Sequence, residues 1–90
     1  MIAIYIVTKN MTAEQHAQGR ERLKEAGAPD DAMRLHSCFG EDGQLQVFDI
    51  WDSQEAFDAF LAYLRPVMEE LGIELAQPPV IMPMVDLVQQ

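Results

Sequence analysis

The chain is poor in cysteine, in basic residues and in long apolar runs, and each shortage excludes a class of protein. Cys38 is the only cysteine, so no disulfide can form within the chain, and a reducing compartment such as the cytoplasm is expected. Six Lys and Arg against fifteen Asp and Glu give an acidic protein with a formal charge of −9. This charge repels phosphate groups, so neither nucleic acid nor an anionic membrane is an expected partner. No apolar run approaches the roughly 18 residues of a membrane span.

The 90 residues suffice for a single globular domain, spanning residues 1–90, and 49% of them are hydrophobic. Ile2–Val7 is a dense run of β-branched and aromatic residues, which predicts a strand. Both faces of this strand are apolar, so we expect it in the middle of a sheet. The run has neither a basic start nor a cleavage site, which argues against a secretory signal.

Two helices are predicted from capping residues and periodicity. Thr12 begins a capping-box pattern that predicts a helix over Ala13–Ala26, closed by Gly27. The apolar residues of this helix are few and small, so we expect it to be half exposed. A second helix begins after Ser53 and ends at Gly72. Its apolar residues recur at spacings of three and four and form a broad stripe: Phe57, Phe60, Leu61, Leu64, Val67, Met68 and Leu71.

Three further strands complete the pattern. Met33–Phe39 and Gln44–Trp51 are predicted to form a hairpin, because Asp42-Gly43 between them is a strong turn signal. Val80–Val88 is predicted as the last strand, and Pro83 within it favours an edge position or a bulge. The order βαββαβ predicts an α+β, ferredoxin-like fold, with a four-stranded antiparallel sheet and two helices on one face.

The hairpin turn determines which side chains meet across the strands. A two-residue turn at Asp42-Gly43 places His36 opposite Asp49 and Arg34 opposite Trp51, whereas a three-residue loop would break this pairing.

Alternation along the hairpin separates two sets of side chains. A mostly apolar set is expected to face the helices: Met33, Leu35, Ser37, Phe39, Phe48 and Ile50. A mixed set is expected on the open face: Arg34, His36, Cys38, Leu45, Val47, Asp49 and Trp51. This open face is too apolar to be left to solvent, so we expect a homodimer in which two sheets stack through it and enclose a cavity.

The segment Phe48-Asp-Ile-Trp-Asp-Ser-Gln-Glu-Ala-Phe57, in which a strand ends in Trp and a Ser caps the next helix, resembles the dimeric α/β-barrel superfamily. The resemblance is to its antibiotic biosynthesis monooxygenase-like branch, particularly a subgroup of short bacterial proteins of mostly unassigned function. It implies a ferredoxin-like homodimer with Trp51 lining a cavity. Relatives include cofactor-independent oxygenases of quinols and anthrones, and haem-degrading enzymes. Those that oxidise quinols or degrade haem usually carry a His on the second helix. Phe57–Leu64 has none, which argues against haem degradation and weakens quinol oxidation.

His36 and Asp49 are the candidate catalytic residues. A carboxylate beside the imidazole would orient it and raise its basicity, making His36 a general base near neutral pH. The alternative is a polar pair that only fixes the strand register. Trp51, Tyr5 and Arg34 are candidate ligand-binding residues, Trp51 by stacking and the other two by hydrogen bonds to a ligand oxygen. The alternatives are that Trp51 fills the interior and that Arg34 is a surface charge.

No metal site is expected, because Cys38, His36 and Asp49 lack supporting ligands elsewhere, and His16 is expected at the surface. The expected function is binding of a small apolar or aromatic molecule. If the protein catalyses, we expect proton abstraction by His36, followed by reaction with oxygen, cyclisation or isomerisation, with no bound cofactor. The alternative is a non-catalytic ligand-binding or structural module whose own side chains fill the cavity.

Overall fold

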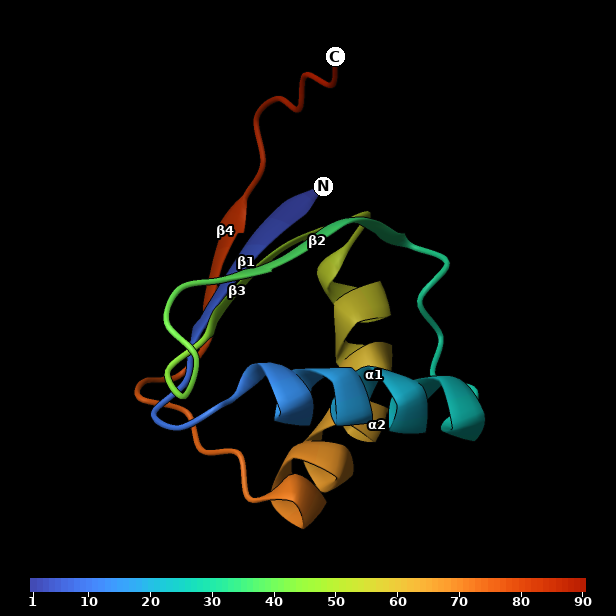
Figure 1. Ribbon diagram of the computed structural model, residues 1–90. Helices are drawn as coiled ribbons and strands as arrows, with labels where there is room; N and C mark the ends of the chain where they lie inside the picture. Colours follow the sequence, from blue (N-terminus) through green and yellow to red (C-terminus); the bar gives the residue numbers. More distant parts are fainter.

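The computed structural model describes residues 1–90 and contains six elements in the predicted order βαββαβ (Figure 1). They are β1 (Ile2–Val7), α1 (Ala13–Ala26), β2 (Met33–Phe39), β3 (Gln46–Trp51), α2 (Gln54–Leu71) and β4 (Val80–Pro83). The strands form one antiparallel sheet in the order β2-β3-β1-β4, and both helices cover the same face of it. The ferredoxin-like prediction and the central place of β1 are therefore confirmed. Neither helix combines the length and the apolar composition that crossing a bilayer requires.

Helix α1 begins and ends where its capping residues predict. Thr12 accepts a hydrogen bond from the Gln15 amide, and the Gln15 side chain accepts one from the Thr12 amide. Gly27 closes the helix with a φ of 72°, in the left-handed region that glycine tolerates best. The hairpin loop also contacts this start, since the Asp42 carboxylate accepts from the Ala13 amide at 2.7 Å and the Met11 carbonyl accepts from two loop amides.

Strand β4 is shorter than predicted. It lies at the edge of the sheet, as Pro83 suggests, but it ends at that proline instead of reaching Val88. Proline has no N–H to continue the ladder. One further backbone bond follows, from the Met84 amide to the Met1 carbonyl, and residues 85–90 leave the sheet (Figure 1).

The hairpin has the predicted central register but not the predicted end. Asp42-Gly43 occupies the middle of a turn that the Gln44 amide closes on the Glu41 carbonyl, and His36 lies opposite Asp49. Strand pairing is irregular between Met33 and Leu35, so Met33 lies opposite Trp51. The predicted pairing of Arg34 with Trp51 is therefore wrong, because the bulge at Arg34 shifts the register by one residue.

The predicted assignment of the two sheet faces is also wrong. Trp51 is fully buried against Phe57 and Phe60 of α2, and His36 contacts His16 of α1. Most of the mixed set of hairpin side chains therefore faces the helices, and most of the apolar set lies on the opposite face. The bulge makes two exceptions: Arg34 is exposed, and Met33 lines the space under the helices. Burial of the polar groups is possible because each finds a partner, and no buried side-chain polar atom is left without one.

The core lies mainly between the sheet and α2. Its buried members are Ile4, Ile6, Met11, Leu45, Val47, Trp51, Phe57 and Ile73. Helix α1 contributes a single buried residue, Gly19. A Cβ atom at this position would contact Val67 and Leu71 of α2. The thin apolar stripe predicted for α1 is confirmed, and α1 is held against α2 more closely than against the sheet.

Candidate functional site

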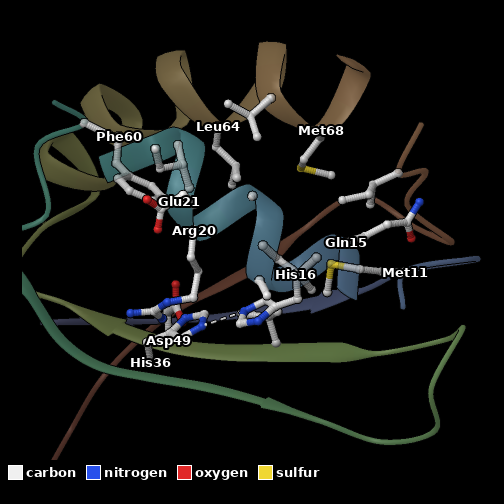
Figure 2. Close-up of a pocket in the computed structure, with 18 of the residues that line it drawn as sticks. Met11, Gln15, His16, Arg20, Glu21, His36, Asp49, Phe60, Leu64 and Met68 are labelled. Atoms are coloured by element: carbon white, nitrogen blue, oxygen red, sulfur yellow. Dashed lines mark hydrogen bonds and ion pairs between the residues drawn. The ribbon is translucent and has the colours of Figure 1, made fainter. Parts of the chain in front are cut away.

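A cavity of about 620 Å³ lies between the sheet and the two helices. Figure 2 shows its two sides: Phe60, Leu64 and Met68 of α2 form an apolar roof, and His16, Arg20, His36 and Asp49 gather at a polar floor. Helix α1 runs alongside and contributes side chains to the floor and the rim. A pocket of several hundred Å³ with one apolar and one polar side suits a small organic molecule that carries a few oxygen groups.

Asp49 orients His36 at the floor of this cavity. Their Nδ1 and Oδ1 atoms are 2.7 Å apart, and Asp49 is 4% exposed. The second carboxylate oxygen accepts a hydrogen bond from the Trp51 indole at 3.3 Å. Because a carboxylate can only accept, His36 holds its proton on Nδ1 and presents Nε2 to the other side.

His16 meets that exposed nitrogen from α1. The two Nε2 atoms are 3.0 Å apart, and the ring planes are parallel to within 1°. The ring centroids lie 5.2 Å apart, so the rings meet edge to edge, nitrogen to nitrogen (Figure 2). One proton is shared between them. The chain Asp49–His36–His16 thus forms a hydrogen-bonded relay that joins a buried carboxylate to the cavity.

Burial lowers the pKa of His16 below its ordinary value of 6.5. The charges of His36 and Arg20 lower it further, and Asp49 acts in the opposite direction. The lowered pKa keeps the His16 imidazole neutral at neutral pH, which leaves the relay able to accept a proton.

The sequence predicts a surface position for His16, and this prediction is wrong. His16 is half-buried and lines the cavity. The signal that could have found it is helical spacing, because Gly19 and Leu23 follow it by three and seven residues and lie on the same side of α1. Its partner His36 is twenty residues away in sequence, and no local pattern reveals that contact.

The five candidate residues named from the sequence do not form one site. His36 and Asp49 lie together in the cavity. Trp51 lies behind Asp49 and packs on α2 without lining the cavity. Arg34 lies on the exposed bulge and holds Asp52 with two hydrogen bonds, and Tyr5 lies on the opposite sheet face, bonded to Gln46.

Cys38 does not extend the site toward metal or thiol chemistry. Burial raises the pKa of its thiol, which keeps it protonated, and the side chain packs against the core. No three His, Cys, Asp or Glu side chains gather closely enough to hold a metal ion.

No family model and no curated protein sequence matches the chain. Solved structures do. SnoaB, a cofactor-independent oxygenase from Streptomyces nogalater, matches in a single-substitution variant with a TM-score of 0.67 and 14% identity over 99% of this chain and 97% of that one. A suggested antibiotic biosynthesis monooxygenase from Chloroflexus aurantiacus matches with a TM-score of 0.65 and 14% identity, over 99% and 98% of the two chains.

The chain therefore has the fold of the antibiotic biosynthesis monooxygenases over its whole length, and proteins of this fold include cofactor-independent oxygenases. The fold alone does not determine the chemistry. A de novo designed protein, Foldit4, matches with a TM-score of 0.60 and 11% identity over 93% of this chain and 98% of its own. Any statement about function must come from the side chains of the cavity.

Proposed function

We propose that the cavity binds a small, largely apolar, aromatic molecule and that the Asp49–His36–His16 relay removes a proton from it. The observation that carries this proposal is the 3.0 Å contact between the two imidazoles at the floor of a cavity with an apolar roof. Two histidines that pair in this way, with one of them anchored by a buried carboxylate, are arranged for proton transfer.

The direction of transfer follows from counting protons. Two neutral imidazoles hold one ring proton each. The proton of His36 lies on Nδ1 toward Asp49, so the shared proton belongs to Nε2 of His16. The Nδ1 of His16 then carries a free lone pair and is the accepting atom. When it takes a proton from the ligand, the shared proton moves to His36, and the positive charge arrives beside the Asp49 carboxylate.

His16 is thus the outer base and His36 the relay, whereas the sequence alone favours His36 as the base. The anion that remains on the ligand is electron-rich and can react with oxygen directly, cyclise or isomerise without a bound cofactor. The match to SnoaB, which is described as a cofactor-independent oxygenase, supports the first of these outcomes. The open volume of the cavity supports a ligand-binding protein over a module filled by its own side chains.

The experiment is oxygen uptake with a panel of quinols and anthrones, preceded by native mass spectrometry to find a co-purified ligand. We expect His16→Gln and His36→Gln to lower turnover of any substrate found by about 100-fold or more, the usual contribution of a general base. Gln18→Ala, on the exposed side of α1, is the control and should keep full activity. Full turnover in both histidine variants would refute the relay. Ligand binding without turnover of any substrate would refute catalysis and support a ligand-binding protein.

We also propose that two copies associate through the open face of the sheet. This face carries the partly exposed Tyr5, Leu35 and Phe48, and Phe39 at its rim is 43% exposed. The two helices cover only the other face (Figure 1). A charge at Val47 cannot test this, because Val47 faces the helices. Phe39→Asp should instead convert a dimer into a 10.2 kDa monomer in sedimentation, and a monomeric parent protein would refute the proposal.

A further inference from the structure

Arg20 is a cation without a protein partner at the floor of the cavity. Two of the six Lys and Arg side chains form ion pairs. Arg22 pairs with Glu70, and Arg34 pairs with Asp52, both outside the cavity. Arg20 lines the cavity and makes no ion pair. Its five N–H donors are therefore available to a ligand.

The position of Arg20 places it beside the relay. It follows His16 by four residues, so both side chains leave the same side of α1. Figure 2 shows the Arg20 guanidinium reaching down toward His36 and Asp49, while the Glu21 carboxylate stays higher, toward Phe60. The charge of Arg20 is one of the causes that lower the pKa of His16, which agrees with this proximity.

The other charges of the cavity do not occupy this guanidinium. Asp49 already accepts from His36 and from Trp51 with its two oxygens. Glu21, Lys24 and Asp30 also line the cavity, and none of them forms an ion pair. Arg20 is therefore an unpaired cation that lies beside the relay, next to the nitrogens that would accept a proton (Figure 2).

We propose that Arg20 binds the oxyanion that forms when the relay takes a proton from a hydroxyl group of the ligand. This inference rests on the proposed function and narrows its ligand class to phenols and enols. The O–H bond breaks, its proton goes to His16, and its electron pair stays on the oxygen as a negative charge. The guanidinium pairs with that charge through charge-assisted hydrogen bonds, which are stronger than those between neutral groups. A ligand whose acidic hydrogen lies on an unactivated carbon would gain nothing from Arg20.

The test uses para-nitrophenol, which absorbs visible light only when it is ionised. Titration of the bound probe gives its acidity in the cavity directly, with no need for turnover. We expect binding to the unmodified protein to raise the ionisation constant of the probe by about tenfold or more, as a cation next to a phenol does. Arg20→Gln should bind the protonated probe and abolish this increase.

Arg22→Gln is the matched control, since it removes the same charge from the same helix outside the cavity, and it should keep the increase. Arg20→Lys keeps the positive charge without the planar guanidinium, so it should keep part of the increase in the ionisation constant. Arg20 is exposed, so these variants are expected to fold, which far-ultraviolet circular dichroism verifies. An unchanged increase in Arg20→Gln, or a bound probe with its ordinary acidity in the parent protein, would overturn the inference and leave the relay intact. A probe that does not bind at all would count against the proposed function itself.

Discussion

The two helices cover the same face of the sheet in different ways. Helix α2 places Phe57 and Val67 in the interior, with Phe57 only 1% exposed, and its aromatic rings enclose Trp51. Helix α1 buries only Gly19, and the cavity lies along it. The two helices therefore have different roles. One provides the apolar contacts that stabilise the fold, and the other carries polar side chains to a space that those contacts leave open.

The comparison is tested most strongly by removing an aromatic ring from α2. Phe57→Ala should lower the free energy of unfolding by about 3–5 kcal/mol, because it leaves a cavity against Trp51 in a packed interior. Leu23→Ala, on half-buried α1, should cost less than about 2 kcal/mol. Urea unfolding of both variants measures the contrast. Equal losses would mean that α1 stabilises the sheet as much as α2 does.

A smaller loss of stability is expected at Asp49, which is bonded both to His36 near α1 and to Trp51 against α2. Asp49→Ala should cost about 2 kcal/mol, because the donors of His36 and Trp51 both lose their acceptor in a buried site. The same change at Asp52, whose partner Arg34 is exposed, should cost less than about 1 kcal/mol. Urea midpoints again give the comparison, and a similar cost at both positions would show that Asp49 contributes no more to stability than an exposed carboxylate does.

A substitution at Gly19 can increase the contribution of α1 to stability. A Cβ at this position would lie 3.7 Å from Leu71 and 3.8 Å from Val67, which is ordinary contact. Gly19→Ala should therefore stabilise the protein by about 0.5–1 kcal/mol, because it removes backbone freedom from a helix interior. Thermal unfolding measures the gain. A lower melting temperature would indicate that the two helices cannot accept even one methyl group between them.

The smallest expected effect is the pH dependence of stability that is due to His16, a half-exposed residue. Its pKa is lowered on folding, so the unfolded chain binds more protons just below pH 6.5. The stability due to neutral His16 is complete above pH 6.5 and is lost as the pH falls through the pKa of the folded state. We expect His16→Gln to lose less stability than the parent between pH 7.5 and 5.5. Parallel losses in urea titrations would contradict the lowered pKa.

The sequence predicted contacts within one hairpin better than contacts between layers. The pairing of His36 with Asp49 follows from a turn centred on Asp42-Gly43, although the six residues between Phe39 and Gln46 lie outside the ladder. Alternation shows which side chains share a face, but it does not show which face the helices cover. Hydrophobicity alone predicts that the more apolar set faces the helices. This prediction is wrong because Trp51 supplies the largest buried side chain and the polar groups beside it satisfy one another.

The contact of His16 with His36 and the free guanidinium of Arg20 were beyond prediction for a related reason. Both depend on the distance between α1 and the sheet. Packing against α2 and the hydrogen bond from the Ala13 amide to Asp42 of the hairpin loop determine this distance. A polar helix with few apolar positions gives little information about that distance. The bulge at Arg34 likewise has no glycine or proline to announce it.

The length of the hairpin loop affects the position of α1, and proteins of this fold can therefore differ in their cavities through this loop. Asp42 caps the start of α1, and Met11, which lines the cavity, accepts two hydrogen bonds from the same loop. An insertion or deletion in this loop would displace the helix that carries His16 and Arg20, although the loop itself lies outside the cavity. Loop length is thus a way to change cavity width and the spacing of the relay together, without any substitution among the residues that face the ligand.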